Sequence, residues 1–194
     1  MASKGNTSTV YTLPVVVHIV HNNGPENITD AQAEQGIAYL NQVFGNSGNF
    51  NSPEGVEVGI EFCLAKRSPQ GNPTYGIVRH QSPLTDMGIY PSIHNLFDLV
   101  SWDSKKYINI ILVKEACLSG NCNIAGFAVY PSGHGQIVDG IVIGAGYFGS
   151  GLINAVVAAH EMGHYLGLRH TFEGGCQNGD CLDDGDKVCD TPPD

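Results

Sequence analysis

The 194-residue chain lacks any long hydrophobic run and is short of positive charge. It has no stretch of about 18 consecutive apolar residues, so it offers no candidate membrane span. Nine Lys and Arg residues stand against 19 Asp and Glu residues, which gives a net charge of −10. Without a basic patch the chain cannot neutralise phosphates, which argues against a nucleic-acid partner. We therefore expect no membrane and no nucleic-acid partner.

The acidic residues are concentrated at the C-terminal end of the sequence. Residues 171–194 contain seven carboxylates and a single basic residue, Lys187. Such a run is either a solvated tail or a loop that binds a hard cation such as Ca²⁺ through its carboxylates. Composition alone leaves both interpretations open.

The cysteine count predicts disulfides. An even number of cysteines without a CxxC pair favours an oxidising, extracellular compartment, so we expect a secreted protein. The segment CLSGNC (117–122) is short enough to close a local loop. Connectivity is otherwise open, and an intracellular zinc protein with reduced cysteines is the alternative. The six are Cys63, Cys117, Cys122, Cys176, Cys181 and Cys189.

Hydrophobic periodicity predicts an α/β (α+β) fold with a twisted, mostly parallel, five-stranded sheet. The predicted helices are a backing helix at 29–45, a short helix at 91–102 and a central helix at 149–167, which is apolar nearly all round and so expected to be buried. Residues 72–90 read as a loop because turn formers recur throughout. The predicted strands are residues 10–21, 56–65, 106–113, 124–131 and 136–146.

The stretch HEMGHYLGLRH (160–170) has the spacing of a metal site. On a helix, His160 and His164 are one turn apart and face the same way, so both imidazoles can reach one metal. Gly167 tolerates positive φ, which lets the chain leave the helix sharply and bring His170 back as a third ligand. Three protein ligands leave one position open for water, as in catalytic zinc sites.

Glu161 lies beside this predicted metal and is free to hold a water. Zinc would lower the pKa of its bound water and stabilise the oxyanion of the tetrahedral intermediate. Glu161 would take the proton of that water as general base and then protonate the leaving amine. The alternative is a buried helix with incidental histidines. That helix would leave imidazoles and a carboxylate without partners in an apolar environment, which is costly. We therefore favour a catalytic zinc site with Glu161 as its base.

The zinc motif and its flanking segments resemble the metzincin zinc endopeptidases, and more narrowly the pappalysin group. The motif continues into HTFEGGC (170–176) and GDKVCDTP (185–192), and GFAVYP (126–131) and DGIVI (139–143) precede it. The resemblance implies a secreted zinc-dependent endopeptidase acting on protein or peptide substrates. It also implies that residues 1–167 form an N-terminal catalytic subdomain with its active-site helix at about 151–166.

The resemblance implies two further sets of site residues. The backbone of the strand at Gly126, Phe127, Ala128 and Val129 would form the upper rim of the cleft and pair with an extended substrate by strand addition, although a plain edge strand is an equal alternative. The acidic loop would bind calcium, with Asp186, Thr191 and Asp190 as the ligands carried over by motif.

The chain departs from the metzincin pattern after the third histidine. Metzincins carry a methionine in a tight turn there, whereas the only methionines in this chain are Met1, Met87 and Met162. We therefore expect residues 168–194 to be the start of a C-terminal subdomain truncated before the Met-turn, with a missing C-terminal fragment or a removed propeptide as partner. The alternative function is a catalytically incomplete fragment or a non-catalytic, metal-stabilised peptide-binding module.

Overall fold

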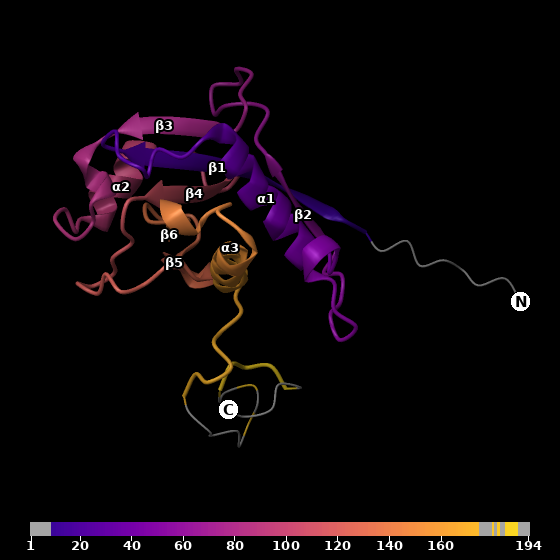
Figure 1. Cartoon of the computed structure of the whole chain (residues 1–194). Helices are drawn as coiled ribbons and strands as arrows, with labels where there is room; N and C mark the ends of the chain where they lie inside the picture. The colour runs from indigo at the N-terminus through magenta and orange to yellow at the C-terminus, as the bar shows by residue number, and fades with distance from the viewer. Residues whose placement is uncertain (1–8, 175–179, 181, 183–184, 190–194) are drawn as a thin grey trace, which may run out of the picture.

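A mixed six-stranded sheet organises the computed structural model, which describes residues 9–174, 180, 182 and 185–189. The strand order is β2-β1-β4-β6-β5, with β3 also pairing with β1, and only the β5–β6 pair is antiparallel (Figure 1). This confirms the predicted mostly parallel α/β fold. The strands are β1 (Tyr11–His21), β2 (Ile60–Leu64), β3 (Ile77–Gln81), β4 (Ile108–Val113), β5 (Gly126–Ala128) and β6 (Ile141–Gly144); the helices are α1 (Asp30–Phe44), α2 (Ile93–Val100) and α3 (Leu152–Tyr165).

The prediction of five strands was wrong, because β3 lies inside the segment predicted to be a loop. β1 is long enough to pair with two strands along one edge: residues 11–15 pair with β2 and residues 17–21 pair with β3. β3 reads IVRHQ, follows closely spaced turn formers and is half-exposed at the sheet edge. It therefore lacks both the apolar run and the clean alternation by which a strand is recognised in a sequence.

The other strands are shorter than predicted. The predicted strand at 136–146 begins only at Ile141, and the predicted strand at 124–131 narrows to Gly126–Ala128. A strand continues only while a neighbour supplies partners for its backbone groups. β4 pairs with β6 over residues 110–113, so the β-branched residues before Ile141 have no ladder to join.

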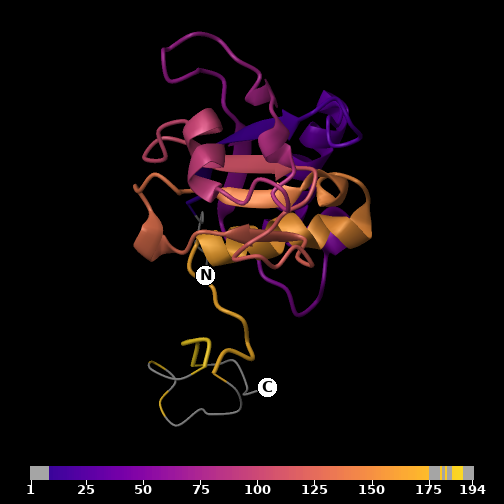
Figure 2. The same ribbon diagram turned by 90° about the vertical axis from the view of Figure 1, so that its left-hand side faces the viewer.

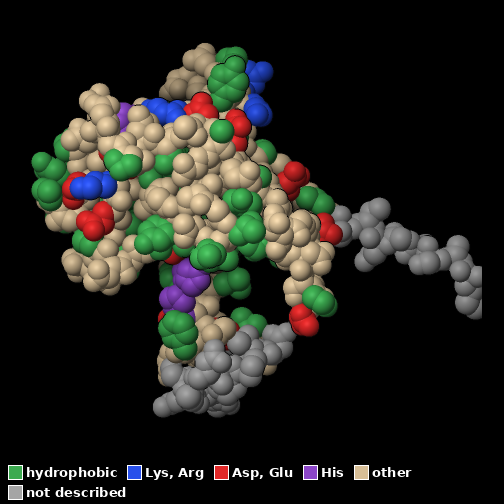
Figure 3. All heavy atoms as spheres, viewed as in Figure 1, with side chains coloured by type: hydrophobic (Ala, Val, Ile, Leu, Met, Phe, Trp, Pro, Cys, Tyr) green, Lys and Arg blue, Asp and Glu red, His purple; other side chains and the backbone are tan. Residues whose placement is uncertain are grey.

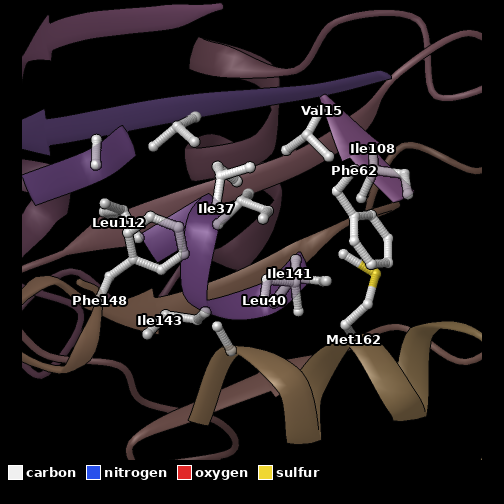
Figure 4. Packing of buried hydrophobic residues seen from close by; sticks show 14 of the residues in the cluster. Val15, Ile37, Leu40, Phe62, Ile108, Leu112, Ile141, Ile143, Phe148 and Met162 are labelled. Atoms are coloured by element: carbon white, nitrogen blue, oxygen red, sulfur yellow. The ribbon is translucent and has the colours of Figure 1, made fainter. Parts of the chain in front are cut away.

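Each face of the sheet carries its own hydrophobic cluster. One cluster joins β1, β4 and β6 to α1 and α3, and Figure 4 shows Met162 of α3 pointing toward Ile141 and Phe62 beneath the sheet. The other joins alternate residues of the same strands to Leu96 and Phe97 of α2. Helices thus cover both faces, which explains why the central strands are almost uninterrupted apolar runs.

The central helix α3 is buried on one side only, contrary to the prediction. Ala155, Ala158 and Met162 face the sheet and are at most 4% exposed, whereas Ile153 is 89% and Val156 52% exposed. No described residue covers that outer face. Figure 2 shows α3 alongside β5 and β6, with the chain leaving the helix end away from the sheet. The longest helix of the described part of the chain, α1, has 15 residues, and none of the described helices meets the length and hydropathy of a membrane span.

Candidate metal centre

Three histidines converge at the end of α3. His160 and His164 come from the helix, and His170 follows the turn after it. The Nε2 atom of His164 lies 3.0 Å from that of His160 and 3.1 Å from that of His170, and the third side of the triangle is 3.3 Å. Figure 3 shows histidine side chains gathered where the chain leaves the body of the molecule.

The turn after α3 brings His170 back to the helix. The Leu168 N–H donates to the Gly163 carbonyl and the Gly167 N–H donates to the His164 carbonyl, a Schellman pattern that ends the helix. Gly167 has φ of 107°, a conformation that residues with a Cβ rarely adopt. The sequence therefore needs glycine at this position if the third histidine is to meet the other two.

The protonation of His164 leaves a lone pair facing the other rings. Its Nδ1 atom lies 2.7 Å from the Leu168 carbonyl oxygen, which can only accept, so Nδ1 carries the hydrogen of the neutral ring. Burial and the two neighbouring histidines lower the pKa of His160, which favours the neutral form of that ring. Four ligands at about 2.0–2.1 Å around zinc stand about 3.3 Å apart. The triangle of nitrogens therefore fits a tetrahedral zinc ion.

Glu161 is buried beside the triangle. Its side chain is 6% exposed, and burial raises its pKa to about 7, against the opposing effect of His164. A carboxyl group with a pKa in that range can exchange a proton near neutral pH, as a general base does. A cation held by the three histidines would favour the carboxylate form.

A cleft of about 590 Å³ opens over the histidines and Glu161. One wall is β5 and the other is α3, so the groups that could react lie between a strand edge and a helix. Aliphatic side chains extend the cleft away from the histidines. They are Leu118, Ile124, Val156 and Val157.

β5 presents only alternate backbone groups to this cleft. The carbonyl of Ala125 accepts from the Gly144 N–H of β6, and the Val129 N–H donates to the carbonyl of Gly140, just before β6. By the antiparallel alternation, Gly126 and Ala128 direct their N–H and C=O groups to the other, open edge. Phe127 packs into the second core cluster. Of the four predicted substrate-strand residues, two therefore have backbone groups available at the edge, and two face β6.

Glycine at position 126 lets the strand approach the helix. A Cβ at Gly126 would stand 3.2 Å from Cγ of Glu161 and 2.8 Å from the Val142 carbonyl oxygen. A larger residue would therefore push β5 away from the floor of the cleft.

The spacing of the histidine motif did not predict three residues that lie next to the histidines. The Tyr130 hydroxyl lies 3.1 Å from Nδ1 of His164. The Phe172 ring stacks on His170 at 4.8 Å and 9°, and an oxygen of Glu173 lies 3.9 Å from His170 Nδ1. Phe172 and Glu173 could have been suspected from their place next to the third histidine, but only the tertiary structure places Tyr130 there.

Of the three predicted calcium ligands, Asp186 is among the described residues. Asp186 is half-buried, and one of its oxygens accepts a hydrogen bond of 2.9 Å from the Val188 N–H. Asp190 and Thr191 lie outside the described residues. Calcium binding therefore stays a prediction.

Among the described residues, one further group has the spacing to hold a metal. It consists of Glu115, Cys117 and Cys122. These two cysteines form the predicted local disulfide, so they are not available as thiolates. Cys63 is a free thiol and Cys189 is disulfide-bonded. Cys176 and Cys181 lie outside the described residues.

Comparison with known proteins gives a family. The sequence model for the pregnancy-associated plasma protein-A peptidases matches residues 94–194, which include the cleft wall, α3 and all three histidines. The chain belongs to this family, the pappalysins. Pappalysins are metzincin-type metalloproteases, in agreement with the resemblance seen in the sequence.

Solved structures agree with this assignment. Mature mirolysin of Tannerella forsythia in complex with a cleaved peptide is 31% identical, with a TM-score of 0.76 over 96% of this chain and 73% of that one. A promirolysin mutant of the same organism is 28% identical, with a TM-score of 0.72, and the match covers 64% of that chain.

Extracellular metalloproteases of fungi are similar over nearly the whole chain. The protein from Arthroderma otae is 28% identical over 190 residues, and that from Arthroderma benhamiae is 26% identical over 199 residues. These matches cover 94% and 98% of this chain, but 59% and 62% of the relatives. The chain thus spans about three fifths of the length of these curated relatives.

Proposed function

We propose that this pappalysin is a secreted, zinc-dependent endopeptidase in which His160, His164 and His170 hold the zinc ion and Glu161 is the general base. The observation that carries the proposal is the triangle of Nε2 atoms, 3.0–3.3 Å on a side, next to a buried carboxyl group on the floor of a cleft. Three nitrogen ligands with one open position are the donor set of catalytic rather than structural zinc.

The chemistry divides between the metal and the protein. A zinc ion held by the three histidines would polarise the scissile carbonyl and lower the pKa of a bound water. Glu161 holds that water, takes its proton and passes the proton to the leaving amine, as in general acid–base catalysis. The buried position of Glu161 supports this role because a desolvated carboxylate is a stronger base than an exposed one.

The substrate we propose is an extended segment of a protein or peptide. It adds to the open edge of β5, where the backbone groups of Gly126 and Ala128 pair with the peptide as a neighbouring strand would. The scissile bond then passes over Glu161, since Gly126 lies directly against that side chain. The mirolysin neighbour that holds a cleaved peptide supports this substrate class.

Secretion and calcium complete the proposal. A disulfide between Cys117 and Cys122 is typical of an oxidising compartment, and the fungal relatives are extracellular proteins. We assign calcium to the acidic C-terminal loop through Asp186, Asp190 and Thr191, on the family motif alone.

A peptide library tests the proposal. The 194-residue chain is incubated with mixed peptides, with and without a zinc chelator, and the cuts are mapped by mass spectrometry. Cuts that vanish with chelator and return with added zinc are expected. Bound zinc without any cut would instead favour the metal-stabilised peptide-binding module, and absence of zinc binding would remove both functions.

A further inference from the structure

The loop between β5 and β6 closes on the end of α3. At its start, the Tyr130 ring lies against His164 with ring centroids 5.3 Å apart. Next to it, Pro131 meets the turn at Gly167, whose added Cβ would stand 3.3 Å from the proline ring. The segment that would border the substrate is thus in contact with the segment that carries the second and third histidines.

The far part of the loop is anchored to the same helix end. His134 packs on Tyr165 with ring centroids 4.3 Å apart, and Tyr165 is only 5% exposed. Asp139, 2% exposed, accepts a hydrogen bond from the Gly135 N–H and lies beside Tyr165, whose pKa is raised by burial and by this carboxylate. Because contacts with the end of α3 hold the loop near both of its ends, packing fixes the position of Tyr130.

The hydrogen bonds at His164 define what Tyr130 contributes. The Nδ1 hydrogen of His164 has two acceptors, the Leu168 carbonyl at 2.7 Å and the Tyr130 hydroxyl oxygen at 3.1 Å. Both are neutral oxygen acceptors, a carbonyl and a phenol. Two acceptors from two different elements fix the plane of the ring in both directions, whereas one carbonyl would let it swing about a single contact. The direction of the Nε2 lone pair follows the plane of the ring.

We propose that Tyr130 is a positioning residue for the metal: its hydroxyl fixes the ring of His164 and couples the substrate-side strand to the metal ligands. This rests on the proposed function, in which His164 binds zinc. Outer partners of ligating histidines tune both metal affinity and activity, and their loss typically costs 10–100-fold. When the Tyr130 hydroxyl is removed, the Leu168 carbonyl still accepts the Nδ1 hydrogen of His164. We therefore expect a loss at the lower end of that range.

The variant Tyr130→Phe removes the hydroxyl and keeps the ring. Zinc affinity is measured by competition with a chromogenic chelator, and we expect it to fall about 10-fold. The visible spectrum of the cobalt-loaded chain should shift, because it reports the ligand field of His164. The matched control is Tyr75→Phe, in which the tyrosine is 85% exposed and neither quantity should change. Thermal unfolding of the metal-free variants should match that of the wild type.

Kinetics separate positioning from substrate binding. We expect kcat on a cleaved peptide to fall about 10-fold with KM unchanged, because the defect lies in the metal ligand. Unchanged zinc affinity and cobalt spectrum overturn the inference, and so does a rise in KM alone, which would make Tyr130 a substrate contact. If the wild-type chain binds zinc but cuts no peptide, the proposed function fails, while the affinity comparison still decides the role of Tyr130.

Discussion

Two groups of histidines lie in this molecule, and they differ in where their lone pairs point. His160, His164 and His170 direct three Nε2 atoms at one centre. On the opposite face of the sheet, His18 of β1 lies against His80 of β3, with 3.2 Å between Nδ1 and Nε2. Both groups bring imidazoles into hydrogen-bond range, but only the first has the arrangement of a metal site.

The His18 pair is satisfied by hydrogen bonds. Oδ1 of Asn109 accepts from the Trp102 N–H at 2.8 Å and faces Nε2 of His18 at 3.0 Å. Since that oxygen only accepts, Nε2 of His18 carries the hydrogen, and its Nδ1 accepts from His80. Each nitrogen of His18 then has a complementary partner, and no position is left for a cation. Burial lowers the pKa of His18 to about 3, which keeps this ring neutral.

The candidate metal centre has the reverse pattern. The hydrogen of His164 is directed outward to Leu168 and Tyr130, so its Nε2 atom faces the other two rings as an acceptor. Acceptors that face one another repel unless a cation or a proton lies between them. Proximity of histidines therefore does not identify a metal site; the direction of their hydrogens does.

The largest expected effect follows from removing a metal ligand. His164→Ala should abolish zinc binding and reduce peptide cleavage to background, because two ligands remain of three. Zinc content by atomic absorption and cleavage of a library peptide measure the two losses. The control His94→Ala removes an exposed histidine of α2 and should change neither. Full zinc occupancy in His164→Ala would show that another group provides the site.

Replacing the proposed general base, Glu161, should reduce peptide cleavage less than removing a zinc ligand. Glu161→Gln keeps the shape of the side chain but cannot accept a proton, so kcat should fall about 10²–10⁴-fold while zinc stays bound. Glu34→Gln, an exposed change on α1, is the matched control. Retention of turnover in Glu161→Gln would assign the proton transfer to another group.

The second histidine group should affect stability and not metal binding. His18→Leu keeps a similar volume but removes the hydrogen bonds to His80 and Asn109, so the free energy of unfolding should fall by about 1–3 kcal/mol. Urea denaturation of the metal-free chain measures this change. Zinc affinity should equal that of the wild type, and a loss of affinity would show that the two faces of the sheet are coupled.

The free energy of unfolding, measured by the same urea denaturation, should depend on pH through His18. Its folded-state pKa of about 3 lies below the ordinary value of 6.5, so the unfolded chain binds the proton first. Stability is therefore complete above pH 6.5 and falls as the pH drops toward 3, by up to about 1.4 kcal/mol per pH unit. His18→Leu should lack this part of the slope, and the difference between the two curves cancels the contribution of the carboxylates. Parallel curves would show that folding does not lower the pKa of His18.

The two histidine groups differ in how well the sequence alone predicts them. The candidate metal centre is local: helical periodicity places two histidines and a glycine turn places the third, so HEMGHYLGLRH predicts that the three meet. The His18 pair joins residues 62 positions apart through β3, a strand that periodicity did not detect. Exposure of Ile153 and Val156 was missed for a related reason, because an apolar residue does not reveal whether anything covers it.

The sequence by itself determined the parallel sheet, the helices and the position of the histidine motif, because local periodicity, capping and glycine conformation act over a few residues. Tertiary structure alone decided which strand shares an edge with β1, which backbone groups of β5 remain open and which side chain accepts the second hydrogen bond of His164. Those features depend on contacts between segments far apart in the chain. The placement of Tyr130 beside His164 is one of them, since it arises where the β5–β6 loop meets the end of α3.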